Sequence, residues 1–303
     1  MTAPTFFVLG APKCGTTALY HYLVQHPQIC MSSPKEPRCL ELADAADLPD
    51  CYQQAFRHYR GQPAAGEASA TSLFVPYVPR RLKQNYPQAR FVIVLRDPVA
   101  RAFSDWWMYY SSGIERLSFP DAIDENLRRL DRGERFDGRD GEPRWKENVH
   151  GITQQRRIPC RTYVDVGYYG EQLQRYFDLF PREQFCLLRS DELRRDTAGV
   201  MTTVFRFLGV DADVPLIDED SQNEAQGAVS APVLRMFRLA QTMRLPRLLP
   251  HAVNDRLRRA FGRRGARPQI DAATKARLTT HFEEDAHKLE TLLGTTFHRT
   301  KAA

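Results

Sequence analysis

Apolar residues along the chain fall into short continuous runs, each followed by a segment with helical spacing. Residues 6–9, 91–95 and 185–188 are runs of this kind, which suit strands buried on both faces of a parallel sheet. After the first run, Leu19, Tyr22 and Leu23 recur at helical spacing. The alternation predicts a three-layer α/β fold with a central parallel sheet flanked by helices. The ligand is then expected at the carboxyl ends of the strands.

The remaining pattern predicts further helices within a single domain spanning 1–303, because no linker-like composition divides the chain. The expected helices are one or two within 41–60, then 79–86, 98–112, 119–130, 168–180, 197–208 and 272–293. Residues 113–165 are the least regular part, with a charged, glycine-containing run at 131–147. This excursion is interpreted as a substrate lid, with a disordered insertion as the alternative. Residues 233–245 form a basic amphipathic segment that prolines cut short.

The turn after the first run carries candidate chemistry, Gly10-Ala11-Pro12-Lys13-Cys14-Gly15-Thr16-Thr17. The two glycines allow a sharp turn, and the threonines supply hydroxyls where a helix N-terminus exposes free N–H groups. Lys13 adds a full charge, so the turn predicts an anion-binding loop. A loop for ATP or GTP would have lysine at the position of Thr16, so this loop departs from that pattern. A generic glycine-rich turn is the other alternative.

A second strand-to-helix turn follows residues 91–95. Asp97 is a plausible N-cap, and Pro98 suits the first helical position. Arg96 leaves the end of the strand, and Ser104 follows about 9 Å along the helix from Pro98. An arginine fork and a hydroxyl in this arrangement suit one phosphate group.

The two turns together resemble the sulfotransferases that use 3'-phosphoadenosine 5'-phosphosulfate (PAPS), and more closely their carbohydrate and heparan-sulfate type. The resemblance implies a P-loop-like fold and PAPS as cofactor, with adenosine 3',5'-bisphosphate (PAP) as product. It assigns the 5'-phosphosulfate to Lys13, Cys14, Gly15, Thr16 and Thr17, and the 3'-phosphate to Arg96 and Ser104. The resemblance continues through 167–173, 189–193 and 207–210.

The segment Pro34-Lys35-Glu36-Pro37 has a charged pair between two prolines, which predicts an extended conformation outside any helix. It resembles a Lys-Glu-Pro sequence of the carbohydrate-type sulfotransferases, in which the glutamate is the catalytic base. The resemblance implies Glu36 as the base, with Lys35 beside it and Lys13 stabilising the leaving phosphate. A solvated surface turn is the alternative.

The match departs from the family pattern just after this segment. Arg38-Cys39-Leu40-Glu41 stand where aromatic residues are common, and Ala68 stands where a lysine is common. His150, near the end of the excursion, is the second candidate for the base. A late loop, 262–268, is rich in glycine and arginine. By resemblance to basic loops that cover the nucleotide, Arg264, Gly265 and Arg267 are expected cofactor contacts.

Composition adds a few constraints. The chain has 43 Lys and Arg, of which seven are lysine, against 37 Asp and Glu, for a net charge of +6. This balance suits anionic ligands. No recognised nucleic-acid motif is present, so no nucleic-acid partner is expected. No metal-ligand spacing is evident. Six cysteines show no C-x-x-C pair and are expected to be reduced. No apolar run approaches a membrane span, so a cytoplasmic location is expected.

The hypothesis is therefore a sulfotransferase that moves a sulfuryl group from PAPS to an acceptor hydroxyl by in-line transfer. An amine is the less favoured acceptor group, and the acceptor is a glycan, a lipid or a small metabolite. One alternative is a P-loop nucleotide kinase, which would require magnesium and turn over ATP. Another is a non-catalytic binder of polyanions or nucleic acid that uses the arginine-rich surface.

Overall fold

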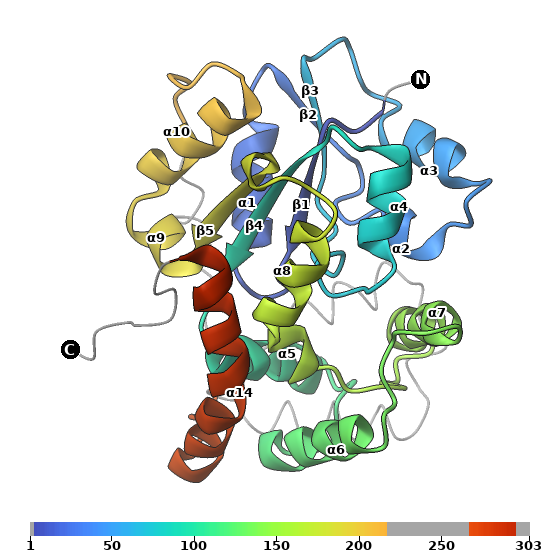
Figure 1. Cartoon of the computed structure of the whole chain (residues 1–303), viewed down its shortest axis with the longest axis vertical. Helices are drawn as coiled ribbons and strands as arrows, with labels where there is room; N and C mark the ends of the chain where they lie inside the picture. Colours follow the sequence, from blue (N-terminus) through green and yellow to red (C-terminus); the bar gives the residue numbers. More distant parts are fainter. Residues whose placement is uncertain (1–2, 217–266, 295–303) are drawn as a thin grey trace, which may run out of the picture.

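The structure is a computed structural model that describes residues 3–216 and 267–294 (Figure 1). Its sheet has five strands in the order β2-β3-β1-β4-β5, and every neighbouring pair is parallel. The strands are β1 (Phe6–Gly10), β2 (Ile29–Met31), β3 (Ala64–Glu67), β4 (Arg90–Leu95) and β5 (Phe185–Arg189). Strand β1 is buried throughout, and β4 is buried except at Arg90, as their continuous apolar runs predict.

Helices cover both faces of this sheet, with α8 in front and α1 behind in the view of Figure 1. The helices are α1 (Thr16–Val24), α2 (Cys39–Leu42), α3 (Leu48–Ala55), α4 (Val78–Asn85), α5 (Pro98–Ser111), α6 (Phe119–Asp131), α7 (Gly141–Thr153), α8 (Tyr169–Phe177), α9 (Ser190–Arg195), α10 (Thr197–Leu208) and α14 (Ala272–Leu293). Short 3₁₀ turns lie at Asp165–Gly167 and Arg182–Gln184. The predicted three-layer α/β fold is confirmed.

Strand β3 has no apolar run that would have predicted it, because it reads Ala-Ala-Gly-Glu. It lies between β1 and β2, where Gly66 pairs with Phe6. A Cβ atom on Gly66 would lie 2.1 Å from Cζ of the Phe6 ring. The glycine at position 66 is therefore required by the large ring on the neighbouring strand. Strand propensity alone does not reveal a strand of this kind.

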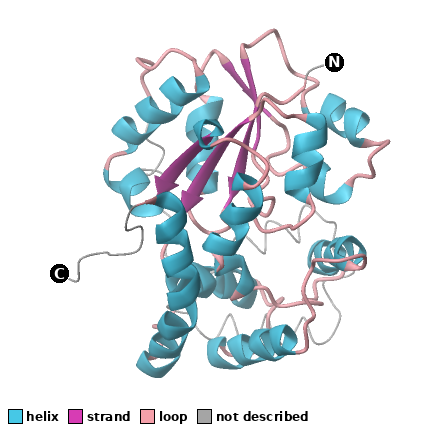
Figure 2. Cartoon of the chain, viewed as in Figure 1, coloured by secondary structure: helices cyan, strands magenta, loops and turns pink. Residues whose placement is uncertain are grey.

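The excursion at 113–165 contains two helices in the described structure, which lie beyond the carboxyl ends of the strands (Figure 2). Helix α6 was predicted, and Ser118 caps it by accepting from the Asp121 amide. Helix α7 falls in the charged run and was missed, because Trp145 and Val149 are its only large apolar residues facing the core. The Trp145 ring packs edge-on against Phe74 and Phe136. The role of this segment as a lid stays a prediction.

A second hydrophobic cluster joins the excursion to the end of the chain. It contains Phe103 and Trp106 of α5, Phe119 and Ile123 of α6, and Phe282 of α14. Helix α14 has the predicted bounds, with Leu278, Phe282 and Leu289 buried. The amphipathic segment 233–245 lies outside the described residues. None of the helices that the structure describes is long and apolar enough to cross a membrane.

The expectation that all six cysteines are reduced is wrong for two of them. Cys39 and Cys51 form a disulfide that joins α2 to α3, with their Cα atoms 5.8 Å apart. The other four are free, and three of those are buried. A pair twelve residues apart on two short helices gave no recognisable spacing signal. Disulfides persist mainly in oxidising compartments, so one support for a cytoplasmic location is lost.

This disulfide is expected to stabilise the fold. Closing a loop of about this length in the unfolded chain stabilises a protein by ~3 kcal/mol. A reductant should therefore lower the melting temperature of the wild-type protein and leave that of Cys51→Ser unchanged. Thermal unfolding with and without reductant measures this difference. Equal melting temperatures of the wild-type protein under both conditions would show that the bond does not stabilise the fold.

Candidate active site

The predicted anion-binding loop joins β1 to α1. Gly15, the N-cap of α1, has φ 106°, and no side chain caps the helix. Such a φ value favours glycine, and the uncapped first turn leaves N–H groups directed toward the loop. Thr16 is buried and Thr17 is exposed at this end. The arrangement is a preformed site for an anionic group.

Lys13 has φ 68° and stands in the loop between these groups. Its Nζ contacts the Met108 Sδ of α5 at 3.3 Å. Burial lowers the pKa of Lys13; the Asp105 carboxylate opposes this shift, and Arg267, Arg101 and Arg96 lower the pKa further. Several cations therefore converge on one loop. Such a concentration of positive charge costs free energy unless an anion is bound.

Arg96 and Ser104 belong to the turn after β4 and to α5. Asp97 caps α5 as predicted, since its Oδ1 accepts from the Ala100 amide at 2.7 Å, and Pro98 is the first helical residue. Burial and then the Arg194 charge lower the pKa of Arg96, and Arg267 contributes as well. These charges place Arg96 beside the same cation cluster as Lys13.

Of the three expected contacts in the late basic loop, only Arg267 lies within the described residues. Its Cζ stands 4.9 Å above the Phe103 ring, next to Ser104 in the sequence. It also lowers the pKa of Lys13 and Arg96. Arg267 therefore lies near Lys13 and Arg96, and its contact with the nucleotide stays a prediction. Arg264 and Gly265 lie outside the described residues.

The sequence reasoning missed a buried ion pair on α5. Arg101 is fully buried, and its Nη1 donates to Asp105 Oδ2 at 3.1 Å. Its Nη2 donates to the Tyr163 carbonyl, and its Nε has no hydrogen-bond partner among the described residues. The pair links the excursion to α5, which carries Ser104, and Asp105 lies about one turn before Met108, the α5 residue that contacts Lys13. An Arg and an Asp four residues apart were the available signal, but helical spacing alone does not show burial.

The predicted base lies on the loop after β2. Glu36 Oε1 accepts from Lys35 Nζ at 2.9 Å, and Glu36 Oε2 accepts from Arg38 Nη2 at 3.0 Å. Burial disfavours the charged carboxylate, but the Lys35 and Arg38 cations outweigh burial, and the pKa of Glu36 lies below its ordinary value. The carboxylate is ionised at neutral pH.

The expectation of an extended Lys-Glu pair is wrong for Glu36. Glu36 and Arg38 both have φ 54°, in the left-handed region. Local proline preferences are overridden by tertiary hydrogen bonds, since the Glu36 amide donates to the Ala68 carbonyl at 3.2 Å and the Arg38 amide donates to Ser69 Oγ at 3.0 Å. The segment lies outside any helix, as predicted.

Tyr109 connects the base loop to α5. Burial and then the Asp105 carboxylate raise the pKa of its phenol, and Glu36 adds to the rise, whereas Arg38 opposes it. The phenol therefore lies between the base loop and the turn of α5 that faces Lys13. That Glu36 and Lys13 belong to one site stays a prediction.

The second candidate for the base has weaker structural support, and the buried cysteine of the anion-binding loop is not suited to act as a nucleophile. His150 is exposed on α7, and the side-chain contacts that the described residues give Lys13 and Glu36 do not include it. Cys14 is buried with its Sγ 3.6 Å from the Tyr169 hydroxyl, and burial raises the pKa of the thiol to about 11. A protonated thiol is a poor nucleophile. Among the described residues, no group of three or more His, Cys, Asp or Glu could hold a metal ion.

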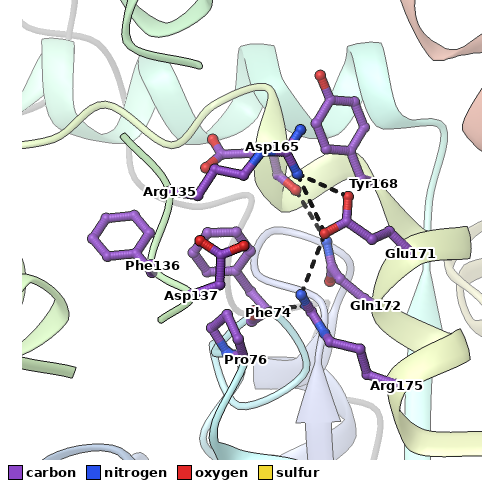
Figure 3. A pocket seen from close by; sticks show the side chains of 10 residues that line it. All are labelled: Phe74, Pro76, Arg135, Phe136, Asp137, Asp165, Tyr168, Glu171, Gln172 and Arg175. Carbon is purple, nitrogen blue, oxygen red and sulfur yellow. Dashed lines mark hydrogen bonds and ion pairs between the residues drawn. The ribbon is translucent and has the colours of Figure 1, made fainter. Parts of the chain in front are cut away.

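A small pocket lies apart from these residues, between α8, the Phe74–Pro76 turn and the 135–137 segment (Figure 3). Glu171 bridges Arg135 at 3.1 Å and Arg175 at 3.4 Å across it. Its volume of about 20 Å³ suits about one water molecule. None of the predicted site residues lines it, so it is not the nucleotide site.

Comparison with known proteins identifies a family and several relatives that resemble this chain. The sulfotransferase domain family matches residues 3–290. Carbohydrate sulfotransferase 15 of Mus musculus is 27% identical over 253 residues, which cover 68% of this chain and 44% of that protein. The human bifunctional heparan sulfate N-deacetylase/N-sulfotransferase 3 is 27% identical over 219 residues, covering 68% of this chain and 22% of that protein. The chain spans less than half the length of these curated relatives.

The fold is also similar to the solved structures of sulfotransferases. The crystal structure of a sulfotransferase from Alicyclobacillus acidocaldarius superposes with a TM-score of 0.68 at 26% identity, covering 98% of both chains. The mouse sulfotransferase SULT7A1 complexed with PAP has a TM-score of 0.50 at 13% identity, covering 96% of this chain and 86% of that one, and shows the fold alone. The fold and the loop define a protein of the P-loop-like class. The chain belongs to the sulfotransferase domain family, and the match favours sulfuryl transfer over the kinase and polyanion-binder alternatives.

Proposed function

We propose that the protein transfers a sulfuryl group from PAPS to the hydroxyl of an acceptor. The observation that carries this proposal is the convergence of Lys13, Arg96 and Arg267 on the uncapped N-terminus of α1, with the Glu36 carboxylate on a neighbouring loop. Cations and N–H groups suit the phosphates of the nucleotide, so the residues present fit the cofactor. PAPS, when bound, supplies the sulfuryl group and a phosphate leaving group.

The roles of the chain's own residues follow from their positions. Lys13 and the N–H groups at the start of α1 stabilise negative charge where the leaving phosphate would lie. Arg96, Ser104 and Arg267 hold the nucleotide by the resemblance of the motifs, which also assigns this role to Arg264 and Gly265, outside the described residues. Glu36 takes the proton from the acceptor, and Lys35 keeps that carboxylate ionised.

The acceptor proposed is a glycan hydroxyl, with a small metabolite or a lipid as the other candidates. The support for a glycan is the Lys-Glu-Pro segment, together with the carbohydrate and heparan sulfate enzymes among the relatives. Screening these three acceptor classes with labelled PAPS tests the choice. The cytoplasmic location stays a prediction, which thiol trapping in intact cells tests through the state of Cys39 and Cys51.

PAP is expected to bind without a metal ion, because lysine, arginine and backbone N–H groups compensate its charge. Titration calorimetry with and without a chelator should give the same dissociation constant. ATP with magnesium is the control ligand and should bind more weakly than PAP. An affinity for PAP that collapses on chelation would contradict the metal-free site and favour the kinase alternative.

A further inference from the structure

The proposed chemistry leaves one buried carboxyl group beside the site unexplained. Glu67 is the last residue of β3, and 1% of its surface is exposed. Its Oε1 accepts from Ser69 Oγ at 2.5 Å, and its Oε2 accepts from the Tyr52 hydroxyl of α3. A carboxyl group in such a place is costly to bury and is retained only where its hydrogen bonds are satisfied.

The hydrogen bonds of Glu67 continue to the base loop. Ser69 Oγ, which donates to Glu67, accepts from the Arg38 amide at 3.0 Å. The neighbouring Ala68 carbonyl accepts from the Glu36 amide at 3.2 Å. The segment that follows β3 therefore holds the residues on both sides of Pro37.

This hold matters because the base loop has an unfavourable backbone conformation. Glu36 and Arg38 both have φ 54°, which non-glycine residues adopt only where surrounding contacts impose it. The Arg38 side chain in turn donates to Glu36 Oε2 at 3.0 Å. Any change in the Arg38 backbone would therefore move the guanidinium that contacts the base.

We propose that Glu67 is a positioning residue of the active site: its carboxylate fixes Ser69, and Ser69 holds the Arg38 amide and with it the loop that presents Glu36. The proposal rests on the proposed role of Glu36 as the base. Glu67 itself touches no reacting atom. Its effect is on the geometry from which Glu36 accepts a proton.

The charge of Glu67 gives this role a measurable signature. Burial raises its pKa from 4.5 to about 7, against the Ser69 and Tyr52 hydrogen bonds and with the help of the Glu41 and Glu36 charges. The other titratable groups whose pKa values respond to Glu67 are the phenols of Tyr52, Tyr86 and Tyr176, which are neutral at this pH.

Protonation of Glu67 changes which groups donate and which accept in its hydrogen bonds. The ionised carboxylate accepts from both hydroxyls, whereas the protonated group must donate to one of them, so the Tyr52 or Ser69 hydroxyl has to turn. The hold on the Arg38 amide should then weaken. Because the pKa of Glu36 lies below its ordinary value, Glu36 does not titrate near pH 7. An activity loss as the pH falls through about 7 is therefore assigned to Glu67.

The experiment measures kcat across the neutral pH range, with saturating PAPS, for the wild-type protein and Glu67→Gln. Wild-type kcat should rise with pH through an inflection near 7, and this inflection should be absent from Glu67→Gln, whose amide does not titrate. The affinity for PAP should be the same in both. A folded Glu67→Gln protein that keeps the inflection would overturn the proposal.

Two further variants decide the matter even where Glu67→Gln fails to fold. Ser69→Ala removes the link to the Arg38 amide and should lower kcat by up to about 100-fold at every pH, with unchanged PAP affinity. Tyr52→Phe removes one donor to the carboxylate, keeps the Ser69 link, and should move the inflection to higher pH. Wild-type kcat in Ser69→Ala, or an unmoved inflection in Tyr52→Phe, would overturn the positioning role.

A stability measurement shows independently which group titrates. Because the folded pKa of Glu67 is raised, the wild-type protein should lose stability as the pH rises from about 4.5 to about 7. The difference in melting temperature between wild type and Glu67→Gln should follow this change.

The activity of the wild-type protein distinguishes failure of the proposed function from failure of the positioning role of Glu67. No sulfuryl transfer by wild type would count against the proposed function, whereas transfer by wild type with unaltered transfer by Ser69→Ala would count against the positioning role alone.

Discussion

Glu36→Gln is expected to lower kcat by roughly 10²–10⁴-fold, the contribution of a positioned general base. Glutamine keeps the size of the side chain and one oxygen for Lys35 or Arg38, but it accepts no proton. The affinity for PAP should change little, because Glu36 lies on a different loop from the anion-binding turn. Single-turnover rates with saturating PAPS measure the chemical step, and calorimetry measures nucleotide binding.

His150→Ala is the matched control, because His150 was the other candidate for the base. It is exposed on α7, so its removal should leave both the rate and the fold unchanged. A Glu36→Gln enzyme with a near-wild-type rate would contradict the assignment. An inactive His150→Ala enzyme with normal PAP affinity would make His150 the base instead.

Lys35 and Arg38 together have two opposing effects on Glu36 as a general base. They keep the carboxylate ionised at neutral pH, which a general base requires. They also lower its basicity, which reduces the driving force for taking a proton. An acceptor hydroxyl must therefore share the carboxylate with Lys35 or Arg38. The rate should therefore depend on the positions of the Lys35 and Arg38 side chains. The hydrogen bond from the Arg38 amide to Ser69 Oγ fixes one of these positions.

The sequence was sufficient where one local signal decides the structure. The apolar runs of β1 and β4, the Asp97 cap and the bounds of α14 each follow from neighbouring residues. The sharp turn of the anion-binding loop belongs to the same group, because Gly10, Lys13 and Gly15 lie within six positions of the chain. These features were predicted at the residue level.

Other features depend on contacts between distant residues. Strand β3 exists because Gly66 leaves room for the Phe6 ring, which lies sixty residues earlier. The prolines around the Lys-Glu pair predicted an extended segment, but hydrogen bonds that its amides donate to Ala68 and Ser69 impose left-handed residues. No rule based on residue spacing predicts this strand or this backbone conformation.

Residues of the site were missed for the same reason, because their roles depend on contacts with other parts of the structure. Arg38 stood at a departure from the family pattern, so its ion pair with Glu36 was not foreseen. Arg101 and Asp105 lie on one helical face, but their complete burial follows from the packing of the excursion against α5. Charged residues inside a domain are found from the structure because their partners decide whether burial is tolerated.

Arg96→Ala is expected to weaken PAP binding by roughly 10- to 150-fold, the equivalent of about 1.5–3 kcal/mol for a lost charge-assisted hydrogen bond. Ser104→Ala should weaken it in the same direction by less, because a hydroxyl donates one hydrogen bond and carries no positive charge. Adenosine 5'-monophosphate, which lacks the 3'-phosphate, should lose little affinity in either variant. Calorimetry with both nucleotides gives the discrimination for each variant.

Two controls separate a specific phosphate contact from a general loss of positive charge. Lys13→Ala should weaken both nucleotides alike, because Lys13 lies in the loop assigned to the 5' side. Arg128→Ala removes an arginine on α6 whose side chain is 63% exposed, and should leave both affinities unchanged. Equal losses for the two nucleotides in Arg96→Ala would show that Arg96 does not bind the 3'-phosphate, and a loss in Arg128→Ala would show that net charge, rather than position, governs binding.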